Sequence, residues 1–101
     1  MNQEKGDDLL PGSDLVREGL ADLEKGKMSE SALLVLIASP RLRRLGIEIP
    51  QAEHSQPFEH QLYELLEERL GAGAHSHYNS LIRRIVSYAR ALERERSARK
   101  T

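Results

Sequence analysis

The chain has 101 residues, of which 39% are hydrophobic and 31% charged, and its formal net charge is −1. This length is enough for one hydrophobic core but not for two. The absence of cysteine excludes a disulfide framework, a thiolate nucleophile and a cysteine-based zinc site, and it fits a reducing compartment, so we expect a cytoplasmic protein. With one phenylalanine and no tryptophan, the core has to be built from Leu, Ile, Val and Ala, which favours a helical bundle.

Residues 1–12 are predicted to form a flexible tail ahead of a single helical domain at 13–101. The tail holds three acidic residues and no basic stretch followed by an apolar one, so it lacks the pattern of a signal peptide. The longest apolar run, residues 32–38, is far shorter than the roughly 20 residues that span a bilayer. We therefore expect no membrane association.

Two helices are predicted in the first part of the domain. Ser13 is a candidate N-cap for a helix that runs to about Lys25, and Gly26 is its stop signal. Ser29 marks the next start, and residues 32–38 after it are apolar on every side, as expected of an element wrapped by its neighbours. A central helix and a buried strand both fit this pattern, and the dominance of Leu and Ala favours the helix.

Two further helices are predicted around a surface loop. Ser39 is a candidate N-cap, and Pro40 then opens a short helix over residues 40–45. Residues 51–57 are polar and bounded by prolines, which is typical of a loop. The following segment, Phe58–Leu70, has apolar residues on one face and a glycine at its end, as an amphipathic helix does.

The last predicted helix, from about His77 to Arg96, has the clearest pattern. Ser76 and Asn79 form an imperfect capping pattern at its start. Eight apolar or aromatic residues recur at three- and four-residue steps and form one stripe: Tyr78, Leu81, Ile82, Ile85, Val86, Tyr88, Ala89 and Leu92. The expected fold class is therefore all-α, a compact bundle of four to five helices with a long amphipathic C-terminal helix.

The near-neutral total charge conceals a strong asymmetry along the chain. Residues 75–101 carry seven basic and two acidic residues, whereas residues 1–74 carry eight basic and fourteen acidic ones. The C-terminal helix is thus basic and the remainder acidic. Because a short glycine–alanine link joins the last two helices, we expect them to pack antiparallel, so that the acidic side of one and the basic side of the other could pair.

The basic residues of the last helix form a ridge opposite its apolar stripe. On a helical wheel Arg83, Arg90 and Arg94 lie close together, flanked by Asn79 and Ser87. One interpretation is a contact with the phosphate backbone of a nucleic acid. The other is a solvated face, partly neutralised by nearby glutamates, and the sequence pI of about 6.4 favours it because nucleic-acid-binding domains usually have a pI above about 9.

A second basic cluster, Arg41, Arg43 and Arg44, follows Pro40. A helix-turn-helix is conceivable around it, but a helix of six residues provides barely two turns for a DNA groove. The alternative is that neighbouring leucines anchor the short helix while the arginines face water.

No chemistry can be assigned to particular residues. The four histidines show no spacing typical of metal ligands, and we predict that they are surface residues. The glycine-rich stretch 71–74 lacks the preceding strand and following Lys-Ser or Lys-Thr of a phosphate loop. Arg69 and His75 have a loose spacing seen in helical ribonucleases, which the glycines between them disrupt. We therefore expect no metal and no cofactor, and an enzyme ranks third among the function classes because no residue can be assigned a chemical role.

Two function hypotheses remain from different classes. The first is a non-catalytic interaction module that self-associates or docks a protein partner through the last helix, with Tyr78 and Tyr88 on its apolar flank. The alternative is a nucleic-acid-binding domain that uses the arginines. For both, the candidate interaction surface consists of Asn79, Arg83, Arg84, Ser87, Arg90, Arg94, Arg41, Arg43 and Arg44.

Overall fold

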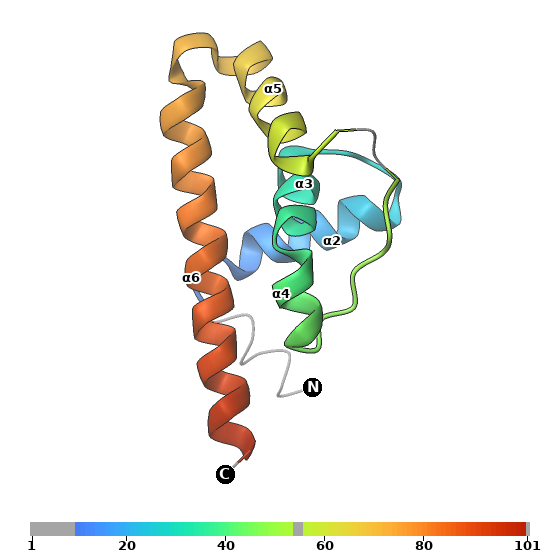
Figure 1. Ribbon diagram of the computed structural model, residues 1–101, viewed down its shortest axis with the longest axis vertical. Coiled ribbons are helices and arrows are strands. Elements are labelled where there is room, and N and C mark those ends of the chain that lie inside the picture. The colour runs from blue at the N-terminus through green and yellow to red at the C-terminus, as the bar shows by residue number, and fades with distance from the viewer. Residues whose placement is uncertain (1–9, 54–55, 101) are drawn as a thin grey trace.

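The computed structural model describes residues 10–53 and 56–100, except for the side chains of residues 99 and 100, and this part of the chain is all-α. Most of the predicted tail, residues 1–9, lies outside the described residues. The elements are α2 (Ser13–Glu24), α3 (Glu30–Ile37), α4 (Ser39–Arg44), α5 (Phe58–Leu70), a 3₁₀ turn η1 (Gly71–Gly73) and α6 (Ala74–Lys100). Figure 1 shows α6 along one side of the molecule, with α5, α3 and α4 beside it and α2 running across its direction.

Helix α3 is the centre of the core, as its uniformly apolar sequence predicts. It contacts α2, α4, α5 and α6. The side chains of Leu34 and Val35 are completely buried, and Leu33 and Leu36 are nearly so. Each such side chain contributes about 1.5–3 kcal/mol through burial. The helical alternative was the correct one for this segment.

Helices α2 and α3 form a hairpin that is closed by a polar network. The Ser29 hydroxyl accepts a hydrogen bond from the Ala32 backbone N–H at 3.1 Å, so Ser29 is the N-cap of α3, at the start that the sequence predicts. The same hydroxyl donates to the buried Asp22 carboxylate at 2.5 Å. Farther along α2, Gly19 lies so close to α3 that an added methyl group would be 2.5 Å from the Ser31 carbonyl oxygen. The absence of a side chain at Gly19 therefore sets the distance between the helices.

Two other predicted N-caps were wrong. Ser13 is the first residue of α2, and the cap position is occupied by Gly12, whose φ of 81° few other residues adopt. Ser39 is likewise inside α4, where Ala38 is the cap residue and Ser39 is buried. Neither cap residue makes a side-chain cap hydrogen bond, and Gly12 lies close to the Arg84 carbonyl of α6.

Helices α5 and α6 are antiparallel neighbours, as expected from the short link. The predicted range of α5 is confirmed, and Gly71 ends it with a φ of 58°. The predicted start of α6 was wrong, because the chain passes through η1 directly into a helix that begins at Ala74. Ser76 is therefore a helical residue and not a cap.

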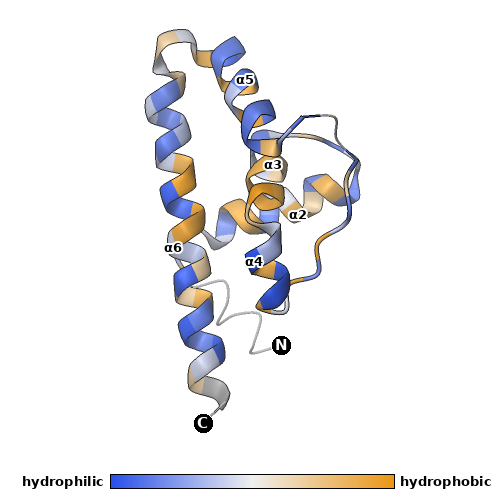
Figure 2. Cartoon of the chain, viewed as in Figure 1, coloured by the Kyte–Doolittle hydropathy of each residue, from blue (hydrophilic) through white to orange (hydrophobic). Residues whose placement is uncertain are grey.

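The apolar stripe of α6 packs on the protein's own core. Leu81, Ile85, Tyr88 and Leu92 are all buried, and Tyr78 is half-buried against the same cluster. Figure 2 shows hydrophobic segments concentrated in α3 and alternating with hydrophilic ones along α6. The side of α6 that remains accessible is therefore the polar one.

Candidate functional site

The polar side of α6 carries a row of arginines in the arrangement that the sequence predicts. Arg83, Arg90 and Arg94, here called the arginine ridge, are all exposed and project from the face opposite to the buried stripe. Between Arg83 and Arg94 the helix rises by about 16 Å. The ridge thus presents three guanidinium groups along a straight, rigid element.

Within the described part of the chain, no ion pair or hydrogen bond engages the side chains of the arginine ridge. The expected pairing with the acidic side of α5 is not seen: Glu64 instead contacts His60, one turn away on the same helix, at 3.1 Å. The ridge faces away from the buried stripe of α6, and two of its arginines are also far from the glutamates along the helix axis. Arg90 lies about 24 Å along α6 from its start, whereas Glu64 lies only about 9 Å from the adjoining end of α5.

Arg84 lies beside the ridge and has a different environment. Its Nη2 is 3.5 Å from a carboxylate oxygen of Asp14, so it links α6 to the start of α2. A shallow pocket of about 330 Å³ opens next to it, with hydroxyl and guanidinium groups on its α6 wall. The pocket is lined by Pro11, Gly12, Ser80, Arg83, Arg84 and Ser87. Four of its six lining residues bear hydrogen-bond donors, which suits an anionic ligand.

Asn79, at the upper end of the candidate surface, is half-buried. Its side-chain nitrogen is 3.2 Å from Nε2 of His75, one turn earlier. This contact holds Asn79 within its own helix, so it is the least available residue of the predicted surface.

The basic cluster of α4 has mainly structural contacts. Arg41 forms an ion pair with Glu93 at 2.7 Å, which joins α4 to α6. Arg43 donates hydrogen bonds to the carbonyl oxygens of Ile49 at 3.0 Å and Pro50 at 3.4 Å. Arg44 is exposed. The structure therefore separates Arg41 and Arg43, which hold neighbouring segments, from the arginine ridge.

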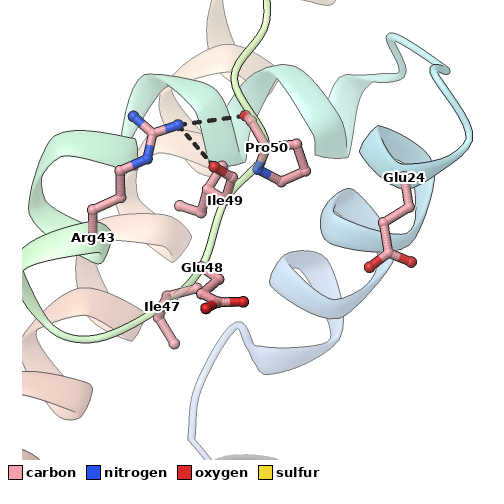
Figure 3. Close-up of a pocket in the computed structure, with 6 residues that line it drawn as sticks. All are labelled: Glu24, Arg43, Ile47, Glu48, Ile49 and Pro50. Atoms are coloured by element: carbon pink, nitrogen blue, oxygen red, sulfur yellow. Dashed lines mark hydrogen bonds between the residues drawn. The ribbon is translucent and has the colours of Figure 1, made fainter.

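The pocket beside Arg43 is built around these structural hydrogen bonds. It has a volume of about 540 Å³ and is lined by Glu24, Arg43, Ile47, Glu48, Ile49 and Pro50. Figure 3 shows the Arg43 guanidinium directed at the two carbonyl groups of the extended segment, with Glu24 on α2 across the open space. Because Arg43 is engaged in holding this segment, the pocket offers no free cation beside its two exposed glutamates.

Arg69 and His75, whose spacing loosely resembles that of a ribonuclease pair, make different contacts. Arg69 binds the Glu30 carboxylate at 2.5 Å, and His77 lies 3.9 Å from the other oxygen of Glu30. His75 contacts Asn79 instead. Among residues 10–53 and 56–100 there is also no group of three His, Asp or Glu side chains placed to hold a metal ion.

Comparison with protein-family models, with curated proteins and with solved structures gives no match. Among the described residues, no helix is both long enough and apolar enough to cross a membrane. Any function therefore has to be argued from the surfaces themselves.

Proposed function

We propose that this chain is a non-catalytic interaction module whose arginine ridge docks an acidic surface of a protein partner. The observation that carries the proposal is the contrast among the arginines. Arg41, Arg43 and Arg84 contact groups within the chain, whereas no described residue engages the three ridge arginines. Their guanidinium groups suit carboxylates, which they can bind with two parallel hydrogen bonds.

The accessible surface favours docking by charge rather than by an apolar face. Tyr88 is only 3% exposed, so the tyrosine flank of α6 is used by the protein's own core. Met28 and Leu70 are the large hydrophobic residues with substantial exposure among the described residues, and neither belongs to α6. Binding through the ridge should therefore weaken as salt concentration rises.

Capture experiments with matched variants test this proposal. The ridge variant is Arg90→Glu/Arg94→Glu, and the control, Arg17→Glu/Lys25→Glu, makes the same charge change at exposed positions outside the candidate surface. Each immobilised protein is incubated with a nuclease-treated extract of the source cells, and bound proteins are quantified. We expect the wild type and the control to retain a common protein that the ridge variant loses. Equal retention by all three would contradict the proposal, provided circular dichroism shows equal helicity.

Nucleic-acid binding is the second candidate, and one observation favours it. The pocket beside the ridge combines the hydroxyls of Ser80 and Ser87 with the guanidinium groups of Arg83 and Arg84, all of which can donate to phosphate oxygens. Fluorescence anisotropy with a labelled DNA duplex tests it. Tight binding with a steep salt dependence, lost when Arg83→Glu is added to the ridge variant, would support this candidate over protein docking. Absence of binding at low salt would eliminate it.

A further inference from the structure

A second surface of the molecule has the charge opposite to that of the arginine ridge. A groove of about 450 Å³ is lined by α5, by Met28 and Leu33 at the α2–α3 hairpin, and by Glu53 and Gln56 ahead of α5. Its apolar residues are Met28, Leu33 and Leu65, and its carboxylates are Glu53, Glu64 and Glu68. We call this surface the acidic groove. Its residues come from three separate segments of the chain.

The acidic groove contains groups that a cationic partner would satisfy. Met28 is 42% exposed, which is unusual among the large apolar residues that the structure describes. Glu64 and Glu68 lie one turn apart on α5, where like charges repel. Within the described residues, the contact that Glu64 makes is with His60, and no ion pair involves Glu53 or Glu68.

The arginine ridge matches the acidic groove in spacing as well as in charge. Arg90 and Arg94 are four residues apart on α6, as Glu64 and Glu68 are on α5, so each pair spans about 6 Å along its helix. Two helices lying side by side, nearly parallel or antiparallel, could therefore form two arginine–glutamate pairs at once. The methylene groups of the arginines would cover the exposed part of Met28.

The two arginines that match the groove are too far from it within one molecule. Arg90 and Arg94 lie at least about 15 Å farther from the α5–α6 turn than Glu64 does. Figure 1 shows α6 at one edge of the molecule, while the segment before α5, which borders the groove, lies on the other side of α5. A contact between ridge and groove therefore requires two molecules.

We propose that the partner of the arginine ridge is the acidic groove of a second copy of this chain. This proposal rests on the proposed function and specifies its partner. The contact is heterologous, because different surfaces of the two copies meet, and each added molecule leaves one ridge and one groove free. The protein then associates head to tail, in a manner that depends on concentration and on salt.

Sedimentation velocity with exchanged charges tests the proposal. The ridge variant is Arg90→Glu/Arg94→Glu, the groove variant is Glu64→Arg/Glu68→Arg, and the fourfold variant combines all these changes. At low salt we expect the wild type and the fourfold variant to self-associate. The ridge variant and the groove variant should each self-associate about tenfold more weakly than the wild type. A mixture of the two variants should form a complex, because the exchanged charges are complementary.

The control variant Arg17→Glu/Lys25→Glu should self-associate like the wild type, since neither residue belongs to the candidate interaction surface or the groove. Self-association of the ridge variant at wild-type strength would overturn the proposal, and so would failure of the fourfold variant to associate while retaining its helicity. A wild type that stays monomeric at all concentrations would also overturn it. In that case, ridge-dependent capture of a different protein would still support the proposed function.

Discussion

The close approach of α2 and α3 predicts that a single methyl group at Gly19 destabilises the fold. In Gly19→Ala the added carbon would lie 2.5 Å from the Ser31 carbonyl oxygen and 2.6 Å from Cγ2 of Val35. Optimal separations for such contacts are about 3.5–4.0 Å, so the helices have to separate by about 1 Å. The Ser31 oxygen belongs to the backbone of α3 and cannot rotate away, as the end of a side chain could.

The expected cost follows from two opposing terms. Overpacking a core lowers the free energy of unfolding by about 1–3 kcal/mol. Because the contacts of Gly19→Ala are so short, we expect a cost near the upper limit of this range. Alanine is favoured over glycine inside a helix by about 1 kcal/mol. The free energy of unfolding should therefore fall by about 2 kcal/mol, and the melting temperature by about 10 °C in a domain of this size.

Urea denaturation followed by far-ultraviolet circular dichroism measures this change. Gly73→Ala is the matched control, because Gly73 is exposed and an added carbon there would come no closer than 3.9 Å to Leu70. We expect the control to be neutral or stabilised by up to about 1 kcal/mol. Unchanged stability of Gly19→Ala, or an equal loss in both variants, would refute the packing argument.

Three further predictions concern side chains outside the proposed interaction surfaces. Ser29→Ala removes a helix cap and the hydroxyl that donates to the buried Asp22, so unfolding in urea should become easier by about 1–3 kcal/mol, and no change would contradict the cap. Burial raises the pKa of Tyr78 above its ordinary value of 10.0, so the neutral phenol is favoured in the fold. Stability should therefore be unaffected by Tyr78 below about pH 10 and should decline as pH rises through the higher pKa of the folded state, a decline that Tyr78→Phe reduces in alkaline unfolding experiments. Glu93→Gln weakens an exposed ion pair with Arg41, so the free energy of unfolding in urea should fall by less than about 1 kcal/mol at low salt. A larger fall would contradict the weak contribution expected of an exposed pair.

The helical elements could largely be predicted from the sequence, because their signals are local. Phe58–Leu70 has a proline before it and a glycine after it, and α5 has these bounds. The errors arose where tertiary contacts set the backbone. Gly12 takes the cap position of α2 where the chain packs close to the Arg84 carbonyl of α6, and no local pattern around Ser13 indicates this.

The alignment of the arginine ridge was predictable from helical periodicity, whereas its lack of partners was not. That property depends on how far α5 and α6 are shifted along each other, which side-chain spacing within one helix does not encode. The contacts of Arg41 with Glu93 and of Arg96 with the Leu45 carbonyl depend equally on where α4 lies beside α6. The acidic side of α5 was predictable from helical periodicity, but the groove itself was not, since its residues from separate segments meet only after folding.

The most direct test of a charge-driven docking surface is the mass of the purified protein at two salt concentrations. Size-exclusion chromatography with light scattering should give a mass above 11.4 kDa at low salt, with no nucleic-acid absorbance. In about 1 M salt, where screening shortens the range of electrostatic attraction to about 3 Å, the mass should return to that of the 11.4 kDa monomer. A monomer under both conditions, or a larger species that persists in high salt, would contradict self-association through the arginine ridge and the acidic groove.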